Sequence, residues 1–227
     1  MQRYPYLLFD ADNTLFCFDK ANRFAFARMC RVCGLPFSDE LLARYERHNN
    51  AAWEKMERGE ATKERIVVER FETFFADIGV GCDPELANRI HLAALGECSF
   101  LMPHALEVVQ TLAKKHRLFL VTNAVASVQK SRLARSELAP YIEAAFISEE
   151  LGAAKPSEAY FDRVFERING ITKENCLVIG DSLTSDILGA NRYGLPTCWF
   201  NIRSAPRPEQ LRIDYEIFDL RELYRIV

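Results

Sequence analysis

Short runs of consecutive apolar residues recur along the chain, and polar residues follow each of them. The runs are Tyr6–Phe9, Leu118–Val121, Ala144–Ile147, Cys176–Ile179 and Thr197–Phe200. Short continuous runs of this kind are typical of strands that are buried on both faces, as in a parallel sheet. Helical patterns separate the later runs, so strand and helix alternate from Leu118 onward. We therefore predict an α/β fold whose core is a doubly wound, Rossmann-like parallel sheet.

The stretch 17–97 breaks this alternation and has a helical pattern throughout. Candidate N-cap residues are Ser38 or Asp39, Thr62, and Asp83 followed by a proline. Such residues satisfy the first free N–H groups of a helix, and proline is favoured at the first helical position. We therefore predict two domains. A Rossmann-like catalytic core comprises 1–16 and 98–227, and an inserted all-helical cap domain comprises 17–97.

The composition excludes several classes of protein. The chain has 227 residues, of which 49% are hydrophobic, and its 29 basic and 32 acidic side chains give a net charge of −3. This balance, without a basic stripe, argues against a nucleic acid polymer as partner. No run approaches the roughly 18 apolar residues of a membrane span, and the N-terminal segment lacks the apolar core of a signal peptide. We expect a cytoplasmic protein, a monomer or a homodimer, that acts on a small molecule away from membranes.

The seven cysteines contain one close pair, Cys30-x-x-Cys33. This pair lies within a helical pattern, and it has neither a second pair nor a nearby histidine to complete a zinc site. We expect Cys30 and Cys33 to be small, buried, hydrophobic side chains on a helix. A reducing compartment follows from this interpretation.

Two carboxylates follow the first predicted strand directly. Residues two apart on an extended backbone point the same way, so Asp10 and Asp12 should face one site. One carboxylate of such a pair can attack an electrophile while the other transfers protons. The pair alone is weak evidence, because a solvated turn or a helix cap accounts for most Asp-x-Asp sequences.

Three more loops add polar side chains beside the predicted sheet. They carry Thr122 and Asn123 after the second run, Lys155 before a helix, and Asp181 with Asp186 after the fourth run. Each residue alone is more commonly a cap or a solvated side chain. In an open parallel sheet, however, the carboxyl ends of the strands meet at one crevice. Carboxylates with one lysine suit Mg²⁺ and a phosphate group, so the sequence predicts metal-dependent phosphoryl chemistry.

These segments resemble, in order, the four motifs of the haloacid dehalogenase superfamily. The matching residues are Asp10-x-Asp12-x-Thr14, Thr122, Lys155-Pro156, and Gly180-Asp181 with Asp186. The helical insertion resembles the cap that this superfamily carries after its first strand. The phosphatases of the superfamily have a second acid in the first motif and the dehalogenases lack it, so Asp12 favours phosphate. Ala124 departs from the glycine that many members have there, and we expect little effect.

The resemblance implies a role for each of these residues. Asp10 would attack phosphorus and form an aspartyl-phosphate, and Asp12 would protonate the leaving oxygen and then activate water. Thr122 and the backbone N–H of Asn123 would hold phosphate oxygens, while Lys155 would offset negative charge. The implied Mg²⁺ ligands are the side chains of Asp10 and Asp181 and the backbone carbonyl of Asp12, with Asp186 acting through water or orienting the other ligands.

The chain is also similar to the pyrimidine 5′-nucleotidases of this superfamily, which dephosphorylate nucleoside monophosphates. The similarity rests on Phe9–Phe16, Asn49–Gly59, Arg70-Phe71, Ile147–Glu150 and Thr197–Asn201. A nucleotide site needs an aromatic platform and polar groups for the base, and the candidates are Phe16, Phe18, Asn49 and Trp53. The alternative for the three aromatic residues is that they fill the core of the cap. A phosphatase for another small metabolite, such as a sugar phosphate or phosphoglycolate, and a non-catalytic binding module also stay open.

Overall fold

The computed structural model describes residues 3–227, and these form two compact units. The α/β unit comprises Ser99–Val227 together with the described part of Met1–Phe18. The helical unit comprises Asp19–Cys98. The chain therefore leaves the α/β unit soon after its first strand and returns to it after the helical unit.

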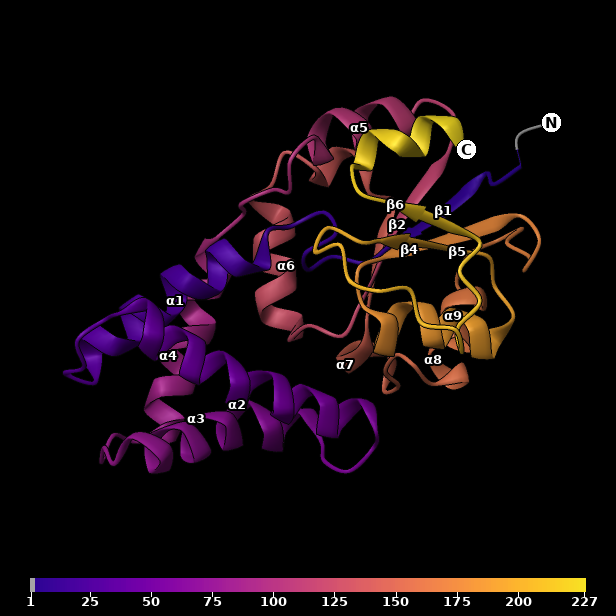
Figure 1. Ribbon diagram of the computed structural model, residues 1–227. Helices are drawn as coiled ribbons and strands as arrows, with labels where there is room; N and C mark the ends of the chain where they lie inside the picture. The colour runs from indigo at the N-terminus through magenta and orange to yellow at the C-terminus, as the bar shows by residue number, and fades with distance from the viewer. Residues whose placement is uncertain (1–2) are drawn as a thin grey trace. The chain divides into compact units, whose positions relative to one another are not determined.

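The α/β unit is built on one sheet of six strands, in the order β3-β2-β1-β4-β5-β6 (Figure 1). The strands are β1 (Tyr6–Phe9), β2 (Arg117–Thr122), β3 (Ala144–Ile147), β4 (Cys176–Gly180), β5 (Thr197–Phe200) and β6 (Tyr215–Ile217). All neighbouring strands are parallel, which confirms the predicted doubly wound α/β fold. The strand β6 was not predicted, because three residues with a central glutamate give no apolar run.

Helices cover both faces of this sheet. They are α5 (Ala105–Leu112), α6 (Ala126–Ala134), α7 (Ser148–Leu151), α8 (Glu158–Phe165) and α9 (Leu188–Tyr193). There are also 3-10 helical turns at Ala139–Tyr141 and Leu220–Arg225 and a π-helical turn at Leu183–Ile187. Successive strand residues point to opposite faces. Leu7 accordingly packs in one core with α5 and the C-terminal turn, while Leu8 packs in a second core with α8 and α9. Figure 1 shows these two layers on either side of the strands.

The order of the strands fixes where a site can form. Leu8 pairs with Phe119 of β2 on one side and with Val178 of β4 on the other. The chain thus proceeds from β1 in one direction to β3 and in the opposite direction to β6. A crevice opens outside the carboxyl ends of the strands at such a reversal. The loops after β1, β2 and β4 therefore meet at one place.

The helical unit contains α1 (Phe18–Val32), α2 (Asp39–Glu57), α3 (Lys63–Ile78) and α4 (Pro84–Glu97). The predicted N-caps of the last three are confirmed. Ser38 Oγ accepts from the N–H of Leu41, and Thr62 and Asp83 make equivalent bonds to the first turns of α3 and α4. Within residues 3–227, no helix is both long enough and apolar enough to cross a membrane.

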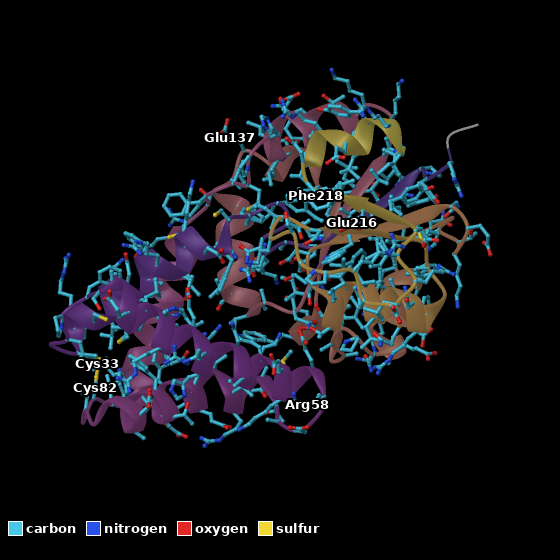
Figure 2. The ribbon with its side chains drawn as sticks, in the orientation of Figure 1. Cys33, Arg58, Cys82, Glu137, Glu216 and Phe218 are labelled. Carbon is cyan, nitrogen blue, oxygen red and sulfur yellow. A yellow bond between two sulfur atoms is a disulfide. The ribbon has the colours of Figure 1, made fainter. Side chains whose placement is uncertain are left out.

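The prediction for the cysteine pair was half wrong. Cys30 is buried on α1 as expected, but Cys33 forms a disulfide bond with Cys82, with Cα atoms 5.9 Å apart (Figure 2). The physical reason is that α1 ends at Val32, so Cys33 lies beyond the helix rather than on its buried face. Its partner is 49 residues away, and no local spacing connects the two.

Candidate active site

The loop after β1 places Asp10 at the crevice. The N–H of Asp10 donates to the carbonyl of Ile179 (2.8 Å), which extends the ladder between β1 and β4 by one bond. The chain then turns, with Asn13 in the left-handed region at φ 58°, a conformation that asparagine tolerates better than most residues. The N–H of Asn13 donates to the carbonyl of Phe16 (2.7 Å) and closes the turn. This geometry fixes the Asp10 carboxylate at the end of the strand.

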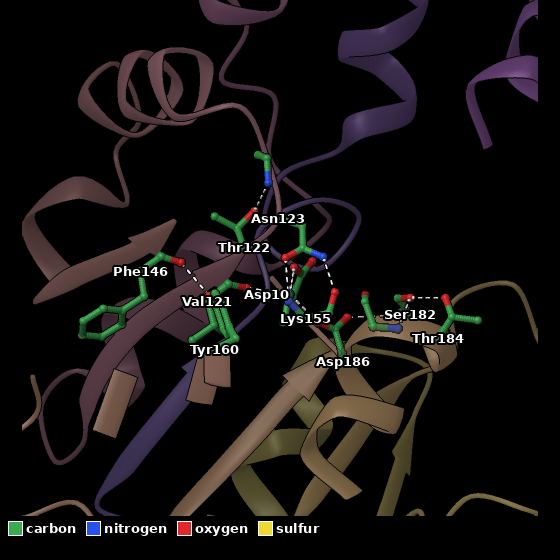
Figure 3. Close-up of polar contacts among 12 residues, drawn as sticks. Asp10, Val121, Thr122, Asn123, Phe146, Lys155, Tyr160, Ser182, Thr184 and Asp186 are labelled. Atoms are coloured by element: carbon green, nitrogen blue, oxygen red, sulfur yellow. Dashed lines mark hydrogen bonds and ion pairs between the residues drawn. The ribbon is translucent and has the colours of Figure 1, made fainter. Parts of the chain in front are cut away.

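Lys155 joins three of the loops. Its ammonium group is buried and donates to Asp10 Oδ1 (2.7 Å), to Asp186 Oδ1 (2.5 Å) and to the carbonyl of Val121 (2.8 Å) (Figure 3). A lysine has three N–H donors, so all of them are used here. Asp10, the candidate nucleophile, and Asp186 therefore share the cation of Lys155.

Asn123 holds the backbone of Lys155. Its side-chain Nδ2 donates to the Lys155 carbonyl (2.8 Å), and its Oδ1 accepts from the Lys155 N–H (2.9 Å). The neighbouring Thr122 is buried at the end of β2, and its Oγ1 accepts from the N–H of Ala124 (3.1 Å). The predicted phosphate-binding residues thus lie beside the lysine, and the Asn123 side chain has a positioning contact that sequence reasoning missed.

The loop after β4 brings Asp186 against the backbone. A Cβ atom on residue 180 would lie 2.3 Å from Asp186 Oδ2, so only glycine fits at Gly180. The same Oδ2 accepts from the N–H of Ser182 (3.1 Å), and Ser182 Oγ caps the following turn. This turn, Leu183–Ile187, is a π-helix, a form that occurs often at functional sites. Asp186 is therefore held by bonds to both of its oxygens.

Three carboxylates cluster around this lysine. Asp10, Asp181 and Asp186 each offer an oxygen, and these atoms all lie within 4.8 Å of one another. Burial raises the pKa of Asp10, and the nearby charge of Asp186 raises it further. Burial, with Asp186 next, raises the pKa of Asp181 to about 7. Burial opposes the charge of Lys155, but the two carboxylates outweigh it and raise its pKa.

The cluster therefore holds more negative charge than one lysine offsets. Its ligand atoms are all hard carboxylate oxygens, the type that Mg²⁺ prefers. A divalent cation placed among them would favour the charged carboxylates, and so oppose both the burial and the repulsion that raise the pKa values of Asp10 and Asp181. The residues present fit a magnesium ion.

The carboxylate of Asp12 has a different partner from that of Asp10. It accepts a hydrogen bond from Nη1 of Arg132, a buried residue on α6, and the guanidinium lies 4.9 Å from the centre of the Phe16 ring. Sequence reasoning missed Arg132, because Asp12 and Arg132 are 120 residues apart and no motif connects them. The only available signal was a cation on the helix that follows Thr122.

The four candidate substrate residues lie in different surroundings. Phe16 is fully buried in the core of the α/β unit, and Phe18 is half-buried at the start of α1. In the helical unit, Asn49 is only 3% exposed and its Oδ1 accepts from Arg70 Nη1 (2.8 Å). Trp53 is half-buried one turn later on α2. A role of these residues in binding a base stays a prediction.

Comparison with known proteins gives a consistent answer. The model of the haloacid dehalogenase-like hydrolase family matches residues 4–194. The HAD-hydrolase YfnB of Bacillus subtilis is 36% identical over 100% of this chain and 97% of its own, and its crystal structure matches with a TM-score of 0.94. The pyrimidine 5′-nucleotidase PynA of Streptococcus pneumoniae is 31% identical over 97% of this chain and 93% of PynA. The pyrimidine 5′-nucleotidase YjjG of Escherichia coli is 29% identical over 99% of this chain and 98% of YjjG.

These findings confirm the family that the four motifs predicted. The match covers most of the chain, and residues 4–194 include Asp10 and Lys155, which meet at the crevice. The similarity to pyrimidine 5′-nucleotidases is also confirmed, over nearly the full length of two such proteins. The chain belongs to the haloacid dehalogenase-like hydrolases.

Proposed function

We propose that this hydrolase is a Mg²⁺-dependent phosphatase that releases phosphate from nucleoside 5′-monophosphates, with a preference for pyrimidines. The observation that carries the proposal is the arrangement around Asp10. One buried carboxylate is held by Lys155 at the centre of the sheet, and a second carboxylate, Asp12, lies two residues later with a separate cation. This arrangement supports the roles of Asp10 as nucleophile and Asp12 as proton donor.

The chemistry divides between the two carboxylates. Asp10 attacks phosphorus and the ester bond to the nucleoside oxygen breaks, giving an aspartyl-phosphate. Asp12 donates a proton to that leaving oxygen and later takes one from the attacking water. Lys155, with Thr122 and the backbone N–H of Asn123, stabilises the charge on the phosphoryl oxygens.

A magnesium ion would be held by the side chains of Asp10 and Asp181 and by the backbone carbonyl of Asp12. Both oxygens of Asp186 already accept hydrogen bonds, from Lys155 and Ser182, which supports its role as a residue that acts through water or orients the other ligands. When bound, the ion would neutralise charge on the transferred phosphoryl group. The related YfnB structure is described as bound to magnesium.

The nucleotide preference rests on the relatives. PynA and YjjG are both named pyrimidine 5′-nucleotidases and match nearly the whole chain, including the helical insertion. Asn49 and Trp53 of that insertion are our candidates for contact with the base. Phe18 is a further candidate at the start of α1, while the full burial of Phe16 favours a packing role.

The test is phosphate release from a panel of nucleoside 5′-monophosphates, sugar phosphates and phosphoglycolate, measured with Mg²⁺ and with EDTA. We expect pyrimidine monophosphates to give the highest kcat/KM, and EDTA to reduce release to background until Mg²⁺ is restored. A preference for sugar phosphates would be consistent with the proposed catalytic residues but would contradict the proposed nucleotide substrate. Release that is unchanged in EDTA would overturn the metal requirement.

Replacement of the nucleophile tests the covalent step. We expect Asp10→Asn to lower kcat by roughly three orders of magnitude or more, because an amide does not attack phosphorus. The matched control is Asp162→Asn on α8, where the carboxylate accepts a bond from Tyr193 and activity should stay near wild type. Turnover that survives in Asp10→Asn would show that another group is the nucleophile.

A further inference from the structure

We propose that Arg132 is a positioning residue, which holds the Asp12 carboxylate in the orientation needed to deliver a proton to the leaving oxygen. The proposal rests on the proposed phosphatase activity and adds to it a residue outside the four motifs. Arg132 acts through Asp12, whereas the proposed nucleophile Asp10 is paired with Lys155. The two carboxylates therefore have separate cations.

The Arg132 side chain is fixed by three neighbours. Its Nη1 donates to Asp12 Oδ1 and to Gln129 Oε1 (3.3 Å), and its guanidinium lies over the ring of Phe16 at 4.9 Å. A guanidinium above an aromatic face is attracted by the ring, and its planar shape leaves few alternative orientations. A cation held in this way presents its N–H group in one direction.

The ion pair is strongly asymmetric in exposure. The Arg132 side chain is 1% exposed, whereas that of Asp12 is 30% exposed. Water reaches the Asp12 side of the pair and screens its attraction, so the pair adds less to stability than its close contact suggests. Here the buried Arg132 is a rigid support, and the partly exposed Asp12 is the residue that can contact a substrate.

Gln129 extends the support by one layer. It lies one turn before Arg132 on α6 and is fully buried, and its Oε1 accepts from the guanidinium. Its Nε2 has no hydrogen-bond partner among residues 3–227. A buried amide with an unsatisfied N–H makes the folded protein less stable than an apolar side chain of the same shape would. Orienting Arg132 is a function that accounts for the presence of this amide.

Comparing substrates with different leaving groups distinguishes a positioning role of Arg132 from a purely structural one. Proton delivery matters greatly when the leaving oxygen is a nucleoside alkoxide and little when it is p-nitrophenolate, a stable anion. We expect Arg132→Met to lower kcat/KM for a nucleoside monophosphate about 30-fold, and that for p-nitrophenyl phosphate less than about 3-fold. The ratio kcat/KM is the right quantity because it reports the phosphoryl-transfer step that Asp12 assists. Arg132→Lys should restore part of the loss on the nucleotide.

Control variants address folding. Arg135→Met changes an exposed arginine three residues later, whose guanidinium donates to Ser131 on the same helix turn, and should leave the hydrolysis of both substrates unaffected. Gln129→Met keeps the volume of the side chain and should give a smaller loss with the same selectivity. Circular dichroism and thermal unfolding of each variant show whether it is folded. An equal loss on both substrates, or no loss on either, would overturn the proposal.

A failure of the proposed phosphatase function can be distinguished from a failure of the Arg132 proposal. If wild-type protein hydrolyses neither ester, the phosphatase proposal fails, and crystal structures of wild type and Arg132→Lys or Gln129→Met then decide the role of Arg132. An Asp12 carboxylate that turns away from its wild-type orientation in a variant would support positioning. An Asp12 carboxylate in the same orientation in all of them would contradict it.

Discussion

Lys155 is the cation on which the buried carboxylates depend. Removing one partner of a buried ion pair leaves the other as an uncompensated charge, at a cost of about 3–5 kcal/mol. We expect Lys155→Met to lower the free energy of unfolding by about this amount in metal-free buffer, measured by urea denaturation. Lys130→Met removes an exposed pair with Glu150 and should change it by less than about 1 kcal/mol. Equal effects of the two variants would show that the Lys155 pair is not structural.

Asp181 makes the stability of the metal-free protein depend on pH. Burial and Asp186 raise its pKa from the ordinary value of 3.8 to about 7. Between these values the folded protein keeps a proton that the unfolded chain releases, so a rise in pH favours unfolding in this window. We expect the free energy of unfolding in EDTA to fall from about pH 4 to pH 7, by at most about 1.4 kcal/mol per pH unit from this group.

Asp181→Asn is the control for this effect. The asparagine does not titrate, so the difference in unfolding free energy between wild type and variant should narrow or reverse as the pH falls from 7 to 5. A difference that stays constant across this range would contradict the raised pKa. Saturating Mg²⁺ should also remove the dependence, because the ion keeps the carboxylates ionised in the folded protein.

The side chains of the site were predictable where they follow a strand, and not where they depend on tertiary contacts. Asp10 and Thr122 come directly after an apolar run and Asp181 follows another after one glycine, and the geometry of a parallel sheet brings such positions together. The partner of Asp12 was not predictable, because Arg132 reaches it only after α6 packs on the sheet. The side-chain bonds of Asn123 to the Lys155 backbone were missed for the same reason.

Helix caps and strands differ in how well local sequence predicts them. The caps at Ser38, Thr62 and Asp83 were correct because the interaction involves residues only two or three positions apart. The edge strand β6 was missed, because it is a strand through its pairing with β5 and its own three residues do not predict one. The partner of Cys33 was missed because it depends on how α1 and α4 are placed within the helical unit.

The helix α4 carries a histidine that makes the helical unit sensitive to acid. His91 is fully buried, and its Nε2 contacts Asn22 Oδ1 at 3.0 Å. Burial, and then the charge of Arg70, lower its pKa well below the ordinary 6.5. Below pH 6.5 the unfolded chain therefore takes up a proton that the folded unit does not, and stability is lost as the pH falls. We expect unfolding monitored by hydrogen exchange in α4 to become easier from pH 7.5 to pH 5.

His91→Gln tests the origin of this acid sensitivity. Glutamine keeps a side chain that can hydrogen-bond to Asn22 but does not titrate. We expect the variant to be less stable at pH 7.5, because its packing against Tyr45 and Phe71 is lost, and to show a flatter pH dependence than wild type. A variant with the wild-type pH dependence would assign the effect to another group.

The disulfide between Cys33 and Cys82 closes a loop that contains α2 and α3. Its cysteines are 49 residues apart, and restricting a loop of that length in the unfolded chain contributes about 4 kcal/mol. We expect dithiothreitol to lower the melting temperature of the wild type. It should have no effect on the double variant Cys33→Ser with Cys82→Ser, which melts at the temperature of the reduced protein. Equal melting of oxidised and reduced wild type would contradict a stabilising bond.

The two units differ in what their sequences make predictable. The α/β unit repeats one pattern, an apolar run followed by a helix, and its class and central strands follow from that pattern. The helical unit has no such repeat, so its helices were predictable one at a time while its internal packing was not. The buried polar contacts of Arg70 with Asn49 and Asn88 illustrate this, since they join α3 to α2 and α4.

The central position of β1 has a consequence for protein synthesis. Tyr6 pairs with Arg117 and with Cys176, so the first strand made by the ribosome has no neighbour until β2 has been made, and only one until β4 has been made. Asp19–Cys98 is by then complete and has its own core. The nascent chain therefore carries the apolar segment Tyr6–Phe9 unpaired throughout translation of the helical unit, in the form that chaperones bind. The strand that precedes Asp10 is thus the first to be made, yet it is enclosed on both sides only after β4 has been made.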